Sequence, residues 1–168
     1  MSTVSLLLFV LAAAPVTGAS SDPKAAIATV LDDWHKAAAD ADEARYFGYF
    51  TPDAVYMGTD ATERWTRDEF RAWSKPYFSK GKAWSFKATS RHITVAKDGA
   101  VAWFDETLDT PNLGPSRGSG VLVKDGATWK IAQYNLSIPI PNDLMDEVVK
   151  RIQTQAPAKP APPAPKKK

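Results

Sequence analysis

The order of two kinds of hydrophobic pattern limits the fold of this chain more than any other feature. In the first half, apolar residues recur at helical spacing. From residue 84 onward the chain contains four strand-like runs: 84–96, 100–109, 117–124 and 128–138. Asp98-Gly99 and Asp125-Gly126 separate neighbouring runs with dipeptides that favour hairpin turns. The sequence therefore predicts an α+β protein, with helices on one face of an antiparallel meander.

Three helices are predicted in the first half. The first begins at Asp22-Pro23, since Asp caps a helix and Pro suits its first turn. The second is short and contains Tyr46 and Phe47. The third begins at a capping box formed by Thr66 and Glu69. A short strand over 54–58 separates the second and third helices, and a short amphipathic helix over 143–153 follows the last strand.

Both ends of the chain differ in composition from its middle. Residues 1–19 carry no charged side chain, and an apolar run ends at Pro15 and the small residues that follow it. This pattern predicts a signal peptide and an exported protein, periplasmic or secreted, with no transmembrane segment in the mature chain. The alternative is a buried or membrane-retained N-terminal helix. Residues 20–153 form the predicted domain, and residues 154–168 form a disordered tail rich in Pro and Lys.

Charge and residue types exclude several classes of function. The formal net charge is +2, but four lysines lie in the last ten residues, and without them 17 basic side chains stand against 19 acidic ones. No basic face for nucleic acid is therefore expected. Because there is no cysteine and only two isolated histidines, no metal site is predicted. No nucleotide-binding loop or nucleophile elbow is present, so no cofactor is predicted.

Two adjacent acids, Asp105 and Glu106, lie inside the strand-like run AVAWFDETLD. Neighbouring residues of a strand point to opposite faces, so one carboxylate points inward if one face is buried. A buried carboxylate costs several kcal/mol unless it is paired or hydrogen-bonded. We expect Glu106 to point inward and to pair with Arg117 across the loop 110–115. The pair is either a structural ion pair or an acid tuned by a cavity, with Arg117 holding an anionic ligand.

Five stretches of the chain, taken in order, resemble one known family. They are YFTPDAVYMGTDATERW, KPYFSKGKAW, AVAWFDE, RGSGVLV and WKIAQYNLSIPIPN. They are similar to SnoaL-like proteins of the nuclear transport factor two-like superfamily. The resemblance implies a cone-shaped fold, in which three N-terminal helices pack on the concave face of a strongly curved antiparallel sheet and leave an apolar cavity. It also implies a homodimer through the outer sheet face. It does not imply one activity, because the superfamily includes isomerases, dehydratases, cyclases, ligand binders and assembly domains.

The catalytic candidates are Glu106 and His92. His92 lies on a long predicted strand, and its imidazole enters the cavity if that strand face is concave; histidine suits proton transfer near neutral pH. His35 is expected at the surface of the first helix. The residues that correspond to the catalytic groups of ketosteroid isomerases, Trp34 and Gly58, cannot perform that chemistry.

Cavities are lined mainly by aromatic side chains with a few polar groups. The residues predicted to bind a ligand are Tyr56, Trp73, Tyr77, Trp103, Arg117 and Asn135. The glycines of RGSGV indicate either a bend in the sheet or room for a ligand. Three functions remain open: an exported domain that binds a small apolar or amphipathic molecule, a cofactor-free dehydratase or isomerase, and a dimeric assembly module.

Overall fold

The computed structural model describes residues 22–155. The predicted signal peptide over 1–19 lies outside the described residues, as does nearly all of the predicted tail over 154–168. The elements are α1 (Pro23–Ala39), α2 (Glu43–Gly48), β1 (Phe50–Met57), β2 (Arg64–Thr66), α3 (Arg67–Ser79), β3 (Lys87–Val95), β4 (Val101–Asp109), β5 (Ser116–Asp125), β6 (Thr128–Ser137), η1 (Asn142–Leu144) and α4 (Met145–Thr154).

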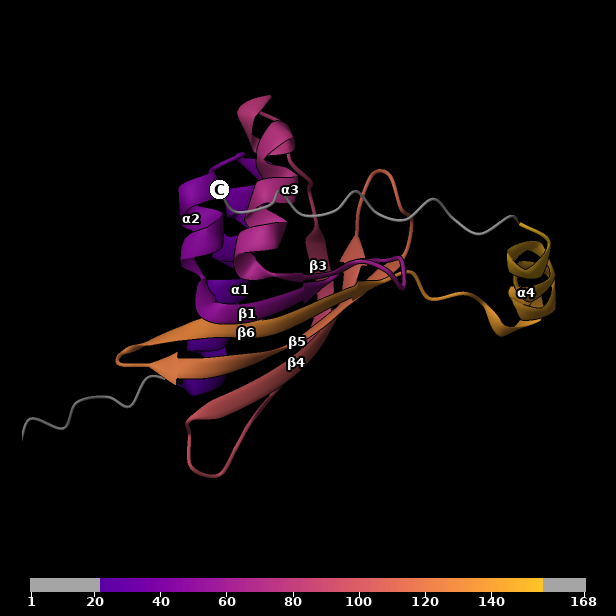
Figure 1. The fold of residues 1–168 in the computed structure, drawn as a ribbon. Helices are drawn as coiled ribbons and strands as arrows, with labels where there is room; N and C mark the ends of the chain where they lie inside the picture. Colours follow the sequence, from indigo (N-terminus) through magenta and orange to yellow (C-terminus); the bar gives the residue numbers. More distant parts are fainter. Residues whose placement is uncertain (1–21, 156–168) are drawn as a thin grey trace, which may run out of the picture.

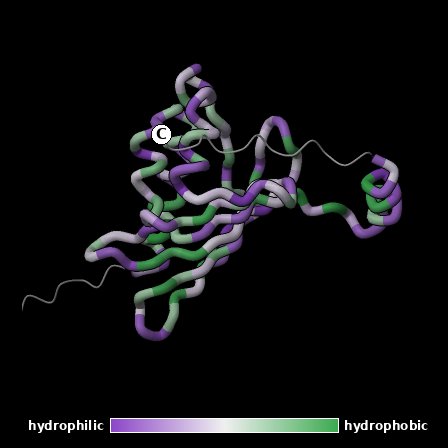
Figure 2. The backbone as a smooth tube through the Cα atoms, viewed as in Figure 1, coloured by the Kyte–Doolittle hydropathy of each residue, from purple (hydrophilic) through white to green (hydrophobic). Residues whose placement is uncertain are grey.

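The predicted meander is confirmed. Strands β3, β4, β5 and β6 follow one another in the sheet, and each pairs antiparallel with the next. Gly99 and Gly126 turn two of the hairpins with left-handed φ values of 70° and 59°, which a residue without a side chain adopts easily. Figure 2 shows hydrophobic residues along these strands and hydrophilic residues at the β3–β4 turn.

The sheet is mixed, and the expectation of an antiparallel sheet is wrong at one pair of strands. The strand order is β2-β1-β6-β5-β4-β3, and β1 runs parallel to β6. Since β1 and β6 are separated by most of the domain, a long crossover joins them, as parallel pairing requires. Alternation along a strand indicates which residues share a face but not the direction of the neighbouring strand, so the sequence pattern could not reveal this pairing.

The N-terminal helices are formed by the predicted local signals. The Asp22 side chain accepts a hydrogen bond from the Lys24 N–H at the start of α1. Thr66 and Glu69 form a complete capping box at the start of α3. Helix α1 packs on β3 and β6, and α3 packs on β1 and β2. Figure 1 shows α1, α2 and α3 gathered on one side of the sheet.

The core lies between these helices and the sheet and is rich in aromatic rings. The Trp34 ring of α1 stacks on Tyr46 at 5.1 Å between centroids and meets Tyr134 of β6 edge-on at 4.7 Å. On β4, Phe104 and Glu106 are buried on the helix side, whereas Trp103 and Asp105 point to the opposite side, here called the outer face. The alternation predicted for this strand is therefore confirmed.

The C-terminal helix predicted over 143–153 is present as η1 and α4. Figure 1 shows α4 away from the sheet, and α4 contacts η1. Its apolar residues Met145, Val149 and Ile152 are exposed. Among the described residues, no helix combines the length and the apolar character needed to cross a membrane.

Candidate functional site

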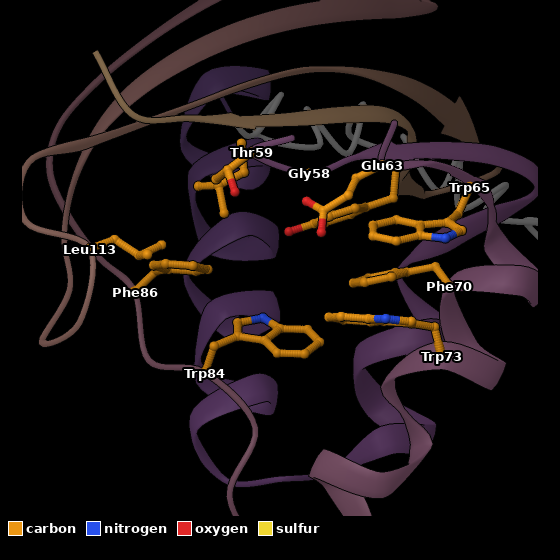
Figure 3. Close-up of a pocket in the computed structure, with 11 residues that line it drawn as sticks. Gly58, Thr59, Glu63, Trp65, Phe70, Trp73, Trp84, Phe86 and Leu113 are labelled. Atoms are coloured by element: carbon orange, nitrogen blue, oxygen red, sulfur yellow. The ribbon is translucent and has the colours of Figure 1, made fainter. Parts of the chain in front are cut away.

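A cavity of about 180 Å³ opens beside the β1–β2 loop (Figure 3). Strands β1, β2 and β6, helix α3, and the segments before β3 and between β4 and β5 all contribute side chains to it. Its lining consists of Tyr56, Gly58, Thr59, Glu63, Trp65, Phe70, Trp73, Trp84, Phe86, Leu113 and Leu136. Six of these residues are aromatic, so the cavity is suited to an apolar ligand.

The aromatic wall is built on α3 and on the strand before it. Phe70 stacks on Tyr56 of β1 with centroids 3.8 Å apart and an angle of 12° between the rings. Trp65 stacks on Trp73 at 5.0 Å, and Trp84 stacks on Phe70 at 5.6 Å. The capping box fixes the start of α3 and thereby the positions of Phe70 and Trp73, one and two turns along the helix. These rings hold one another in place and form a rigid wall.

Glu63 is the one charged side chain in the cavity lining. The Gly58 N–H donates to the Glu63 carbonyl at 2.9 Å, and the Asp60 N–H donates to Glu63 Oε2 at 3.2 Å. A Cβ at Gly58 would overlap this carboxylate, so the missing side chain provides its space. Burial, and then the Glu63 charge, raise the pKa of Tyr56 well above its usual value. The phenol therefore stays protonated beside an acidic group.

A second polar cluster lies in the core around Glu106, which is 1% exposed. Glu106 Oε1 accepts a hydrogen bond from His35 Nε2 at 2.7 Å, and Oε2 accepts one from Arg91 Nε at 2.8 Å. Arg91 Nη1 donates further to Asp32 Oδ1 at 2.8 Å and to the Ala28 carbonyl at 3.2 Å. The cluster therefore connects β3 and β4 to α1.

The charges in this cluster compensate one another. Burial alone would raise the pKa of Glu106, but the hydrogen bonds and charges of His35 and Arg91 outweigh it and lower that pKa. Burial, followed by the Glu106 charge, raises the pKa of the neighbouring Tyr134 well above its usual value. A side chain transfers protons most efficiently near neutral pH when its pKa lies near neutrality. Glu106 is instead an ionised carboxylate with both oxygens occupied.

The predicted pairing of Glu106 with Arg117 is wrong. The β4–β5 register places Glu106 opposite Gly118 and Arg117 opposite Thr107, so Arg117 is exposed on the outer face. The partner of Glu106 comes from β3, where Arg91 lies directly opposite it. A central strand has two neighbours, and the sequence argument considered only the neighbour across the 110–115 loop.

The structure places the two histidines opposite to expectation. His92 lies on the outer face beside Asp105, with Nδ1 3.2 Å from Oδ1 and 77% of its side chain exposed. It does not enter the cavity. His35, expected at a helix surface, is buried against Glu106. The spacing of His35 four residues after Leu31, a core residue of the same helix, was the signal that could have found it.

Of the predicted ligand-binding residues, Tyr56 and Trp73 line the cavity. Tyr77 is 46% exposed and contacts Trp73 outside the lining, with the two rings tilted by 35°. Trp103 is 50% exposed on the outer face. Asn135 also faces outward and lines a neighbouring groove, which shares Gly58, Thr59, Glu63 and Leu136 with the cavity and also contains Arg64.

The glycines of RGSGV provide room for the protein's own side chains. A Cβ at Gly118 would meet the Tyr134 hydroxyl and Glu106, and one at Gly120 would meet the Phe104 ring. Sequence reasoning missed Glu63: its spacing from Asp60 is that of a helix-capping pattern, but the structure places both residues in the loop between β1 and β2. Within residues 22–155, no group of three or more His, Asp or Glu side chains is arranged to hold a metal ion.

Comparison with known proteins identifies the fold. The family model described as "SnoaL-like domain" matches residues 27–141. A nuclear transport factor two-like protein of unknown function from Pseudomonas putida matches with a TM-score of 0.59 and 14% identity, over 73% of this chain and 92% of that chain. No curated protein sequence matches the chain.

Two further solved structures share the fold. A protein of unknown function from the DUF3225 family of Pectobacterium atrosepticum matches with a TM-score of 0.59 and 20% identity, over 72% of this chain and 94% of that one. A candidate scytalone dehydratase from Novosphingobium aromaticivorans matches with a TM-score of 0.59 and 12% identity, over 70% and 84%. The family match covers more than half of the chain, and the protein therefore belongs to the SnoaL-like domain family, with the fold of the nuclear transport factor two-like structure.

Proposed function

We propose that this protein binds a small, largely apolar molecule in the cavity between β1, α3 and β6. The observation that carries the proposal is the cavity itself, about 180 Å³ of space lined by six aromatic side chains and one carboxylate. An apolar cavity of about 150 Å³ is large enough to bind benzene, whereas drug-sized ligands occupy roughly 300 Å³ or more. The volume therefore favours a compact ligand, about the size of one ring with a polar substituent.

Binding is better supported than acid–base catalysis. An enzyme of the dehydratase or isomerase type needs a proton donor or acceptor that touches the substrate. Glu106 and His35 do not line the cavity, and both carboxylate oxygens of Glu106 are already engaged. His92 lies on the outer face. An assembly module whose interior is filled by side chains is less well supported, because a cavity remains. Export and dimerisation through the outer face stay predictions.

The proposal is tested by titrating the ¹⁵N-labelled protein with benzyl alcohol and following its six tryptophan indole N–H signals by NMR. We expect the signals of Trp65, Trp73 and Trp84 to shift and saturate, whereas Trp103 on the outer face stays unchanged. Thr59→Phe, at the exposed rim of the cavity, should weaken binding severalfold. Thr128→Phe, at the exposed start of β6, is the matched control and should not. The absence of saturable shifts in the three cavity signals would contradict the proposal.

A further inference from the structure

We infer that the ligand of this cavity is a compact organic cation, an alkylammonium or quaternary ammonium group held between the aromatic wall and the Glu63 carboxylate. The inference rests on the proposed function and narrows it to one chemical class. It starts from a feature that a merely apolar ligand leaves unexplained, which is a carboxylate directed into an aromatic cavity.

The cavity has a negative charge and no positive one. Its lining contains Glu63 and no Lys, Arg or His. None of the ion pairs formed within residues 22–155 includes Glu63. The protein donor that the Glu63 carboxylate does have is the Asp60 N–H, at 3.2 Å. The Glu63 side chain is half-buried beside the aromatic rings, so a cation from the ligand would pair with its carboxylate.

The aromatic lining complements a cation as well as the carboxylate does. Cations bind over the faces of aromatic rings, most strongly over Trp, and quaternary ammonium groups are typical ligands of aromatic cages. Both Tyr56 and Trp84 stack on Phe70, at 3.8 Å and 5.6 Å between centroids, and Figure 3 shows Trp84 across the cavity from Glu63. A compact ammonium group placed between them would contact the indole and the carboxylate together.

The space for Glu63 is built into the backbone. Gly58 carries no side chain where the carboxylate lies, and the Gly58 N–H bonds to the Glu63 carbonyl to close the loop. The neutral side chains that complete the rim, Thr59 and Leu113, bring no charge that would compete with a ligand. The loop therefore presents one carboxylate to the cavity from a defined position.

The test uses two probes of nearly the same shape, choline and its neutral isostere 3,3-dimethylbutan-1-ol, titrated by NMR on the same tryptophan signals. We expect choline to bind at least tenfold more tightly. Glu63→Gln keeps the shape and the acceptor for the Asp60 N–H, and should weaken choline binding about tenfold while the isostere changes less than twofold. Asp68→Asn, at the exposed start of α3 and outside the cavity, removes the same charge and should change neither affinity.

The possible outcomes distinguish a wrong ligand charge from a wrong binding function. If the neutral isostere binds as tightly as choline or more tightly, or if Glu63→Gln leaves the choline affinity unchanged, the ligand is not a cation. The proposed binding function would still hold. Binding of benzyl alcohol without binding of either isostere would also overturn the cation. If none of the three probes binds the wild-type protein, the cation and the proposed function fail together. Retained dispersion of the tryptophan signals shows that each variant is folded.

Discussion

Arg91 and Glu106 lie directly opposite each other on β3 and β4, and Arg91 Nε is 2.8 Å from Glu106 Oε2. This pair is buried, and it is joined to α1 because the same carboxylate bonds to His35 and the same guanidinium bonds to Asp32. The cluster therefore holds α1 against β3 and β4, at the end of the sheet opposite β2. Its role in stability can be measured separately from ligand binding.

Removing the charge of Glu106 should destabilise the fold strongly. Glu106→Gln removes the buried carboxylate that pairs with Arg91 and leaves Arg91 only the exposed Asp32, and breaking a buried pair in this way costs about 3–5 kcal/mol. The thermal midpoint should fall by about 10 °C or more, as measured by circular dichroism. The control is Asp105→Asn, which removes the exposed neighbour paired with His92 and should cost less than about 1 kcal/mol. An unchanged or raised midpoint in Glu106→Gln would contradict a structural role.

The same cluster predicts a pH dependence. The pKa of Glu106 is lowered in the folded protein, because His35 and Arg91 outweigh the effect of burial. Its contribution is therefore fully present above the unfolded pKa, near 4.5, and is lost as the pH falls through the lower folded pKa. Denaturant titrations from pH 7 to pH 3 should show the stability difference between wild type and Glu106→Gln shrinking below about pH 4.5. A difference that grows on acidification would have the wrong sign.

Gly118 should tolerate no side chain. A Cβ there would meet the Tyr134 hydroxyl and Glu106 Oε1, both of them in the packed core. Gly118→Ala is therefore expected to destabilise by roughly 1–3 kcal/mol in urea unfolding. Gly48→Ala is the matched control, because a Cβ at that helical position meets nothing within 4 Å. It should be neutral or slightly stabilising, since Ala favours a helix over Gly.

Gly58→Ala should affect the ligand more than the fold. The new Cβ would overlap the Glu63 carboxylate and lie 3.0 Å from the Glu63 Cβ, so the whole Glu63 side chain has to shift out of its position. We expect choline affinity to fall severalfold, as in Glu63→Gln, while the urea midpoint changes little. If choline affinity is kept and the protein is strongly destabilised, the geometry described for this loop is wrong.

Some features of this structure were predicted correctly from the sequence, and each wrong prediction has a physical reason. Alternation along β4 correctly placed Glu106 inside. The same alternation places Trp103, three positions earlier, on the other face, so the two residues could not both line one cavity. The register of β4 with its two neighbouring strands could not be predicted, because the hydrophobic pattern does not reveal that Arg91 rather than Arg117 pairs with Glu106.

The cavity was the least predictable part of the molecule. Its lining comes from segments distant in sequence, and two of its aromatic residues, Trp84 and Phe86, lie in the irregular segment before β3. No periodic pattern places such residues. Glu63 was also missed because strand β2, which follows it, was not predicted from the sequence.

The parallel pairing of β1 with β6 also determines when this protein can fold during its synthesis. β1 is made early, but the strand that covers its inner edge ends at Ser137. Until then Trp34 lacks Tyr134, and α1 lacks one of the two strands on which it packs. Because the ribosome adds residues at about 5–20 per second, the nascent chain spends several seconds with these aromatic surfaces uncovered. The last strand of the sheet therefore acts as the closing step of the whole domain, and a chain that stalls before it remains open to chaperones and proteases.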